Sequence, residues 1–558
     1  MKRRWLSRVL SIALTAIMTM GILSGCGNQE DKNSSVQSSE TKTESSSQQQ
    51  TESIAASEEV SEGVTYPMNT DVSLSFYILS DMPTSSAYLS FDDYPFYSGL
   101  EKNTGIDIEW QTPAEGAESS VAFNLLLQDE ELPSIIFGGI DMTRRTELYN
   151  DGLIYDLTDY LAEYAPDFWE YINLPENEAN KRVITNSEGK ILAFPFIRES
   201  DFNITYLGPV IRKDWLDELG LDMPVTLDDW ENVLVAFKEK YGAYLTTRLG
   251  RFQAGISSGT GAYAALGFGC YVDGGEVKCA NTQAEWKEML TYLHRWYEKG
   301  LLDPDFTTLD DATIRSKALN GECGIVVTAT SQLTNFISDA KAEETGAEWV
   351  GLSHPRTAEG APTSYIQTDS QTVRPDKGAV ITTSCSEEEL ITAIKFLNYG
   401  FSEEGMLYWN FGEEGVSYEV AEDGSYKFTE LLTEDERGLT TAIDDYAGMN
   451  GCGVGIQMEA MVKTKFDPVA VEAVYTWTEN TVAREYKLPP FSRTDEEQTR
   501  YSDINSILST YVSEMALKFI TGDESLDNFD DFVDELYSYD LQELLDIQQA
   551  AYDRYMSN

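Results

Sequence analysis

Hydrophobic positions between residues 206 and 238 change from a short apolar run to two helical stripes. Residues 207–211 form a short run of apolar or small side chains, which favours an extended segment over a surface helix. Residues 214–219 then place their apolar side chains on one helical face, and Gly220 is suited to end that helix in a left-handed conformation. The pattern predicts a strand that leads directly into a short helix.

A second helical stripe follows the proline at position 224. Thr226 is followed three residues later by Asp229, a variant of the capping box in which two side chains satisfy the first amides of a helix. Trp230 and the apolar residues after it then recur at helical spacing up to Phe237. Taken alone, the stretch predicts two packed helices of the kind found throughout α/β proteins.

The rest of the chain alternates between strand-like and helix-like patterns. The expected strands are 72–79, 106–110, 134–137, 190–197, 324–327 and 378–383, and the expected helices include 89–103, 121–128, 156–169, 284–299 and 386–399. Strands that alternate with helices are typical of a mostly parallel sheet covered on both faces. We therefore predict an α/β fold.

In open parallel sheets, ligands bind beyond the carboxyl ends of the strands. The loops expected there carry Asp81 after the first strand, and Gly139 and Asp141 after the third. Glycine allows a ligand to approach the backbone, and the carboxylates can accept hydrogen bonds from hydroxyl groups. The same loops also suit ordinary turns with a helix cap, and the sequence leaves both interpretations open.

The first 66 residues do not resemble the folded remainder. Residues 1–25 combine a basic start with a short apolar run and end on Leu-Ser-Gly before Cys26, which is typical of a lipoprotein signal peptide. Cleavage there would leave the thiol of Cys26 to carry a lipid. Residues 26–66 are rich in Ser, Gln and Glu and poor in apolar side chains, so we expect a disordered tether.

Charge and cysteine content narrow the classes of function. The chain has 40 basic and 95 acidic residues, a net charge of −55, which repels nucleic acid and anionic lipid head groups. Nucleic-acid binding is therefore excluded. Cys270 and Cys279 flank a Gly-Gly turn and could face each other across a hairpin, but sequence alone cannot show whether they are bridged.

The catalytic motifs are weak. Residues 255–259 match the G-x-S-x-G elbow of hydrolases, but the preceding segment is a poor strand, and the only histidines are His294 and His354. A pair of carboxylates for glycoside cleavage cannot be recognised among so many acidic residues. Residues 239–244 lack the alternating oxygen ligands of a calcium loop. We expect no enzyme activity, no metal and no cofactor.

Several stretches carry a resemblance to one family. They are the string 208–237, the helix, Asn-Gly turn and strand of 313–330, the Asn-Tyr, Ser-Glu-Glu-Gly and Asn-Phe-Gly motifs of 398–416, the end of a helix at 519–522 and the end of the chain at 551–555. Together they resemble the extracellular, type II solute-binding lipoproteins of bacterial ABC importers, in particular the large family that includes alginate-oligosaccharide binders. The maltodextrin-binding protein is a more distant likeness, and residues 329–332 lack the tryptophan that maltodextrin binders carry there.

The resemblance implies a two-lobed periplasmic-binding-protein-like fold of type II, with discontinuous lobes joined by a hinge. Residues 67–207 with about 382–470 would form the N-lobe, and residues 208–381 with about 471–558 the C-lobe. Residues 207–211 would be the crossing between them. The ligand would be clamped in the cleft as the lobes close.

The implied ligand is a carbohydrate, specifically an oligosaccharide. Its contacts would come from both lobes and from the crossing: Asp81, Gly139, Asp141, Phe196, Arg198, Tyr206, Ser331, Gln332, Trp409 and Trp477. Aromatic rings would stack on sugar rings and polar groups would bind hydroxyls, although Trp409 suits a core position equally well. Residues 329–332 are expected to form a ligand-contacting loop.

The resemblance also implies partners and a location. We expect a monomer outside the bacterial cell membrane, anchored by the lipid on Cys26, that delivers its ligand to the permease subunits of an ABC importer. Two other classes stay open. One is a receptor lipoprotein that binds a peptide or signal, and the other is a secreted glycoside hydrolase.

Overall fold

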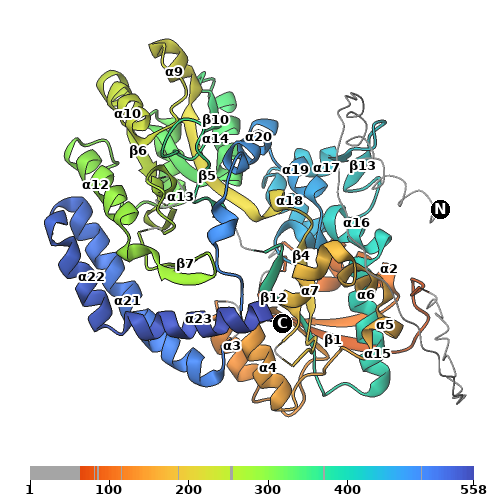
Figure 1. Cartoon of the computed structure of the whole chain (residues 1–558). Coiled ribbons are helices and arrows are strands. Elements are labelled where there is room, and N and C mark those ends of the chain that lie inside the picture. Colours follow the sequence, from red (N-terminus) through yellow and green to blue (C-terminus); the bar gives the residue numbers. More distant parts are fainter. Residues whose placement is uncertain are drawn as a thin grey trace, which may run out of the picture. The chain divides into compact units, whose positions relative to one another are not determined.

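The computed structural model describes residues 63–80, 82–84, 87–114, 116–186, 188–251, 256–264, 266–368, 371–491 and 493–557 (Figure 1). The expected signal peptide, Cys26 and most of the expected tether lie outside these residues, as does Asp81. Between them, the described residues build two main sheets, each with its own helices and hydrophobic cores.

The first sheet is mostly parallel, as predicted. Its spatial order is β15-β4-β12-β3-β1-β2, and only β12 runs antiparallel to its neighbours. Its strands are β1 (Ser73–Ile78), β2 (Asp107–Gln111), β3 (Ile135–Gly139), β4 (Phe194–Arg198), β12 (Val373–Ile381) and β15 (Gly455–Gln457). The carboxyl ends of β1, β3, β4 and β15 share one side of the sheet, which we call the carboxyl edge.

The second sheet is built on the crossing segment. Its order is β10-β5-β9-β6, with β11 paired to the start of β5. Its strands are β5 (Thr205–Arg212), β6 (Tyr244–Thr247), β9 (Cys323–Ala329), β10 (Trp349–Gly351) and β11 (Gln367–Thr368). The predicted extended segment 207–211 therefore lies inside a strand that pairs with three others.

The sheet order corrects one expected boundary. Residues 208–381 were assigned to the C-lobe, but β12 pairs with β3 and β4 in the first sheet. The chain has therefore returned to the first sheet by Val373, about nine residues earlier than expected. The pattern of 378–383 predicted the strand itself but carried no information on its partners.

Helices cover both faces of each sheet (Figure 1). Those that pack on the first sheet are α2 (Pro95–Thr104), α3 (Ser119–Leu126), α4 (Met142–Asn150), α5 (Leu161–Tyr164), α6 (Pro166–Ile172), α7 (Glu178–Ile184), α15 (Glu387–Asn398) and α16 (Glu403–Phe411). Those on the side of the second sheet are α9 (Lys213–Leu219), α10 (Leu227–Tyr241), α12 (Ala284–Glu298), α13 (Asp311–Leu319), α14 (Thr330–Ala342) and α20 (Pro468–Thr478). Three further helices extend this group by packing on α12 and on one another, namely α21 (Asp495–Thr521), α22 (Phe529–Ser538) and α23 (Leu541–Ser557).

Smaller elements join or extend these two groups. They are α8 (Asp201–Ile204), α17 (Glu430–Thr433), α18 (Leu439–Tyr446), α19 (Glu459–Lys465) and the hairpins β7 (Cys270–Asp273) with β8 (Glu276–Cys279) and β13 (Tyr418–Val420) with β14 (Tyr426–Phe428). Cys270 and Cys279 are direct partners across their hairpin, and both thiols are free.

The predicted helix ends in the crossing stretch are confirmed. Gly220 ends α9 with φ of 64°, and Thr226 and Asp229 form a reciprocal capping box at the start of α10. Elsewhere, helices begin at prolines and not at the residues that the sequence pattern predicted. The helix expected over 89–103 begins at Pro95, and that expected over 156–169 is split, with α6 starting at Pro166. Proline favours the first position of a helix because its missing amide is not needed there.

Three aromatic residues expected at the ligand belong to hydrophobic cores instead. Phe196 and Trp409 lie in the core of the first sheet, with exposures of 0% and 3%. Trp477 has no exposed surface and packs in the core between α20 and the second sheet. Because packing covers their rings, none of the three presents a face on which a sugar could stack in this structure.

Among the described residues, no helix combines the length and apolar character that a membrane crossing requires. The same part of the chain holds no cluster of three or more His, Cys, Asp or Glu side chains arranged to bind a metal ion.

Candidate functional site

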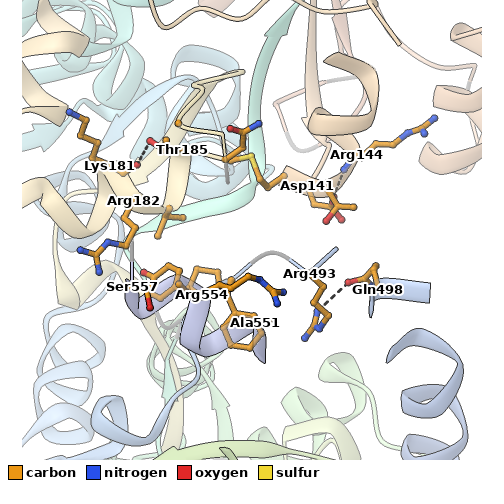
Figure 2. Close-up of a pocket in the computed structure, with 18 of the residues that line it drawn as sticks. Asp141, Arg144, Lys181, Arg182, Thr185, Arg493, Gln498, Ala551, Arg554 and Ser557 are labelled. Carbon is orange, nitrogen blue, oxygen red and sulfur yellow. Dashed lines mark hydrogen bonds between the residues drawn. The ribbon is translucent and has the colours of Figure 1, made fainter. Parts of the chain in front are cut away.

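A cavity of about 1250 Å³ lies beside α4, the helix that follows β3 at the carboxyl edge (Figure 2). One wall is α4 with Asp141, the residue that precedes it. A second is α7 with the turn after it, and a third comes from residues 490–498 and the last turns of α23. Helices that pack on the first sheet and segments near the C-terminus thus line one space.

Asp141 is both a cavity residue and a helix cap. Its Oδ1 accepts a hydrogen bond of 2.8 Å from the amide of Arg144, which confirms the capping role that the sequence left open. The Arg144 guanidinium donates to Glu147 at 2.6 Å. Asp141 still lines the cavity, where its carboxylate can accept from a ligand.

The second wall carries a buried amide with unused donors. Asn186 is 6% exposed, and its Oδ1 accepts from the amides of Glu188 and Lys190 at 3.0 and 2.9 Å. Its Nδ2 has no hydrogen-bond partner among the described residues. Next to it on α7, the Arg182 guanidinium lies 5.7 Å from the ring centre of Tyr555, so this wall meets α23 directly.

The third wall holds two arginines that secondary contacts fix in place. Arg493 lies 3.7 Å from the ring centre of Tyr501 and donates to Gln498 at 3.2 Å and to Gln548 at 2.5 Å, while its Nε has no partner among the described residues. Burial lowers the pKa of Arg493 from its usual value. Arg554 pairs with Glu497, whose carboxylate accepts from both of its terminal nitrogens.

The cavity lining carries far more basic residues relative to acidic ones than the chain as a whole. Five basic residues line it, namely Arg144, Lys181, Arg182, Arg493 and Arg554, against four acidic ones, namely Asp141, Glu147, Glu178 and Asp553. The whole sequence has 40 basic residues against 95 acidic ones. Lys181 points away from the cavity and donates to Asn173, so basic and acidic side chains are nearly balanced at the lining, unlike the acidic excess of the whole sequence (Figure 2).

A second group of expected residues gathers where the two sheets are joined. The guanidinium of Arg198, at the end of β4, lies 6.0 Å from the ring centre of Tyr206, which is 37% exposed. The hydroxyl of Thr330 donates to the carbonyl of Tyr206 at 3.3 Å, which brings Ser331 and Gln332 to the same place. None of these residues lines the cavity beside α4.

Ser331 and Gln332 do not lie in the expected loop. Residues 330–332 form the first turn of α14, which begins directly after β9. Ser331 is exposed, and the buried Oε1 of Gln332 has no hydrogen-bond partner among the described residues. Gly139, the remaining expected residue, ends β3 at the carboxyl edge, where a side chain would meet nothing closer than the Lys377 amine at 3.8 Å.

Sequence reasoning did not predict Arg182, Asn186, Arg493 or Arg554 as site residues. Arg554 lies in the family-like chain ending at 551–555, and that resemblance was the only signal available for any of the four. Their position in one cavity depends on α21 and α23 reaching back to α4 and α7, which no local pattern reveals.

The weak hydrolase motif has a structural role. Ser257 and Ser258 are buried in a 3-10 turn, Ser257–Gly259, rather than at an elbow between strand and helix. The hydroxyl of Ser258 accepts a hydrogen bond of 2.9 Å from the amide of Ser364. His294 lies in α12, with Nδ1 3.0 Å from the carbonyl of Ile520.

Known proteins resemble the chain over most of its length. Lipoprotein LipO of Bacillus subtilis (strain 168) is 27% identical over 62% of this chain and 69% of its own. The fructooligosaccharide ABC transporter substrate-binding protein FusA of Streptococcus pneumoniae serotype 4 is 25% identical over 89% of this chain and 93% of its own. The crystal structure of alginate-binding protein AlgQ2 without calcium ion matches with a TM-score of 0.64 at 21% identity, covering 88% of this chain and all of AlgQ2.

The match to AlgQ2 shows a two-lobed α/β fold of type II, as the resemblance implied. The sequence profile of bacterial extracellular solute-binding proteins matches residues 97–410, more than half of the chain. This chain belongs to the family of bacterial extracellular solute-binding proteins.

Proposed function

We propose that the chain is the substrate-binding lipoprotein of an ABC importer and that its ligand is an oligosaccharide. The observation that carries this proposal is the cavity of about 1250 Å³ lined by α4, α7 and the C-terminal segments. Pockets for small ligands usually measure about 300–1,000 Å³, so this one suits a longer ligand. FusA, which resembles the chain over nearly its whole length, is named for binding fructooligosaccharides.

Hinge closure is the proposed mode of capture. The chain passes between the two sheets three times, at residues 199–204, between β11 and β12, and at 458–467. The proposed N-lobe is 67–207 with about 373–470, and the proposed C-lobe is 208–372 with about 471–558. A ligand that contacts both lobes stabilises the closed state, and the permease would recognise that state. The protein acts as a monomer in this scheme.

The ligand contacts proposed from the sequence fall into two sets. Gly139 and Asp141 belong to the carboxyl edge, and Asp81, which lies outside the described residues, stays a proposed contact from the sequence alone. Arg198, Tyr206, Ser331 and Gln332 belong to the junction between the sheets. The exposed face of Tyr206 is suited to stack on a sugar ring. Closure would bring both sets onto one ligand.

The chain delivers its ligand unchanged and works outside the cell membrane. Its family consists of extracellular solute-binding proteins, and a binding role requires no catalytic group. The proposed anchor is a lipid on Cys26, linked to the folded part by residues 26–66. This tether keeps the cavity near the permease.

A thermal-shift screen of the purified full chain tests the ligand class. A ligand present at about 100 times its dissociation constant stabilises the folded state by about 2.7 kcal/mol, which raises the melting temperature measurably. The proposal expects at least one oligosaccharide to do so. Stabilisation by peptides with no response to any glycan would replace it with the receptor function, and shortened glycans in the mixture would replace it with a hydrolase.

A further inference from the structure

Two cysteines face each other in a hairpin that belongs to neither main sheet. β7 and β8 form a two-stranded sheet of their own, and Cys270 and Cys279 are direct partners in it. An isolated two-stranded hairpin is marginally stable in water, so it depends on packing or on a cross-link. The two thiols lie at the end of the hairpin away from its turn, where a cross-link encloses the whole hairpin.

Hydrogen bonds around the hairpin identify the kind of pair that the cysteines form. Antiparallel strands alternate between pairs that exchange backbone hydrogen bonds and pairs that do not. The amide of Val277 donates to Gln549 on α23 at 2.8 Å, so Val277 and its partner Val272 are not hydrogen-bonded to each other. Two residues along each strand, Cys270 and Cys279 therefore form a pair of the same kind.

The residues beyond the cysteines follow the same alternation. The amide of Ala280 donates to the carbonyl of Gly269 at 2.9 Å, so this next pair is hydrogen-bonded. Asn281 fastens the same end of the hairpin, because its Oδ1 accepts from the Gly269 amide at 2.9 Å and its Nδ2 donates to the Gly267 carbonyl at 3.0 Å. The backbone on both sides of the cysteine pair is therefore held in place.

A non-hydrogen-bonded pair has the geometry that a disulfide requires. The Cα atoms of such partners lie about 4.5 Å apart, and their side chains project close together from one face of the hairpin. Disulfides span Cα separations of about 4.4–6.8 Å. Cys270 and Cys279 can therefore be bridged by rotation of their side chains, without a shift of either strand.

Burial determines when the bond can form. Cys279 is 2% exposed, and burial raises the pKa of its thiol to about 12; burial, with the neighbouring Cys279 thiol, also raises the pKa of Cys270. Because the thiolate is the reactive form, both thiols react slowly once the hairpin is packed in its core. Gly274 and Gly275 have the positive φ of a tight hairpin turn, so the strands can pair early in folding, while the thiols are still accessible.

We propose that Cys270 and Cys279 form a disulfide in the exported protein. The chain belongs to an extracellular family, and disulfides persist outside the cytoplasm. One protein thiolate attacks the disulfide of an oxidised thiol compound such as oxidised glutathione, and the second thiolate then attacks the mixed disulfide. The two protein sulfurs are oxidised, and two molecules of the reduced thiol leave with the two protons that the cysteines lost.

The bond fastens the hairpin that supports one wall of the cavity. Gln549 of α23 accepts from the Val277 amide and donates to the carbonyl of Gly275 at 3.0 Å. The preceding residue, Gln548, accepts from Arg493, which lines the cavity. The hairpin and Arg493 are thus held by consecutive residues of one helix. The bond itself does not depend on which ligand the protein binds.

The first test maps the cysteines of the full chain isolated from a bacterium that exports it. Free thiols are blocked with iodoacetamide in urea at lysis, the disulfides are then reduced and labelled with N-ethylmaleimide, and the peptides are analysed by mass spectrometry. We expect maleimide on Cys270 and Cys279. Iodoacetamide should mark the other cysteines of the folded part, namely Cys323, Cys385 and Cys452.

The second test supplies the oxidant to the purified chain. The reduced chain is refolded from urea with an about tenfold excess of reduced over oxidised glutathione, a mixture that leaves structural disulfides oxidised. The natural chain should lose the mass of two hydrogen atoms, and so should the control Cys452→Ala. Cys279→Ala should keep its full mass apart from the substitution.

Hydrogen exchange of the hairpin amides gives a third readout. Closing a short loop stabilises the closed strands, so exchange in β7 and β8 should be at least about tenfold slower in the oxidised natural chain than in the reduced one. Cys279→Ala should show no dependence on reductant, whereas Cys452→Ala should behave like the natural chain.

Three results would overturn the proposal. They are iodoacetamide on both cysteines of the exported chain, a disulfide from either of them to another cysteine, and a refolded natural chain whose mass shows no bond. Equal hydrogen exchange with and without reductant would contradict the role of the bond in holding the hairpin. None of these measurements uses a ligand, so their outcome is separate from that of the proposed function.

Discussion

The indole of Trp477 lies directly against Gly208. Its Nε1 donates a hydrogen bond of 2.9 Å to the carbonyl of Pro209, and a Cβ built on Gly208 would lie 2.2 Å from the indole ring. This contact joins α20, which follows the last passage between the sheets, to β5, which follows the first. The packing holds two of the proposed hinge passages together, and it explains why Trp477 is not free for a sugar.

Substituting Gly208 by alanine should destabilise the protein. The added methyl group has to displace a buried ring that a hydrogen bond fixes, and such overpacking costs about 1–3 kcal/mol. Urea unfolding of Gly208→Ala measures this cost. The control is Gly267→Ala, where a Cβ meets nothing within 4 Å, and we expect it within about 0.5 kcal/mol of the natural chain. Equal stabilities for the two variants would contradict the packing described.

The capping box of α10 should contribute measurably to stability. Thr226 Oγ1 accepts from the Asp229 amide at 3.2 Å while Asp229 accepts from the Thr226 amide at 2.9 Å. Thr226→Ala should therefore cost about 1 kcal/mol in the free energy of unfolding, measured in urea. Thr291→Ala, on the exposed face of α12, removes only a bond to a carbonyl four residues earlier and should be neutral or slightly stabilising. A Thr226→Ala chain as stable as the natural one would show that the cap contributes nothing.

Local features of the crossing stretch could be predicted because they depend on neighbours in the sequence. Gly220 ends a helix and Thr226 caps one through contacts within four residues. The mostly parallel first sheet could be predicted because strand-like and helix-like segments alternate along the chain. The start of α14 at Thr330 could not be separated from a loop, because residues 329–332 carry no apolar stripe of their own.

The site was predicted poorly because it depends on distant contacts. Aromatic residues suit a sugar site and a core equally, and only the packing of α20 on β5 assigned Trp477 to the core. Arg493 and Arg554 enter the cavity because the C-terminal helices return to α4 and α7, hundreds of residues away in the chain.

Lys465 should make stability depend on pH above neutrality. Burial lowers its pKa to about 8, against about 10.4 for an unfolded lysine, and its amine donates to Asn450 at 2.8 Å. Below pH 8 the lysine is protonated in both the folded and the unfolded chain, so the full cost of burying its charge lowers the free energy of unfolding. As the pH rises from 8 to 10.4, the folded state loses its proton first, so this group makes the free energy of unfolding rise.

A comparison of Lys465→Met with the natural chain isolates the contribution of Lys465 to the pH dependence of stability. We expect the variant to be the more stable at pH 7, with the difference shrinking as the pH approaches 10.4, in urea unfolding at constant ionic strength. Other lysines and tyrosines titrate in the same range, but they cancel in the difference between the two chains. A difference that does not change with pH would contradict the lowered pKa.

Removing Cys26 should release the protein from the membrane. If the lipid on this thiol is the anchor, Cys26→Ala expressed in a bacterium that processes lipoproteins appears in the medium or the soluble extracytoplasmic fraction, while the natural chain sediments with membranes. Cys452→Ala serves as the control because it removes a cysteine of the folded part. Membrane association that survives Cys26→Ala would contradict a lipid anchor at this residue.

Binding without turnover is the central claim, and one titration addresses it most directly. The purified full chain is titrated calorimetrically with the oligosaccharide that stabilises it most, and the ligand recovered afterwards is analysed by mass spectrometry. The account predicts saturation at one ligand per chain and recovery of the ligand at its original length. Recovery of shortened sugars, or the absence of saturable binding for every oligosaccharide tried, would contradict it.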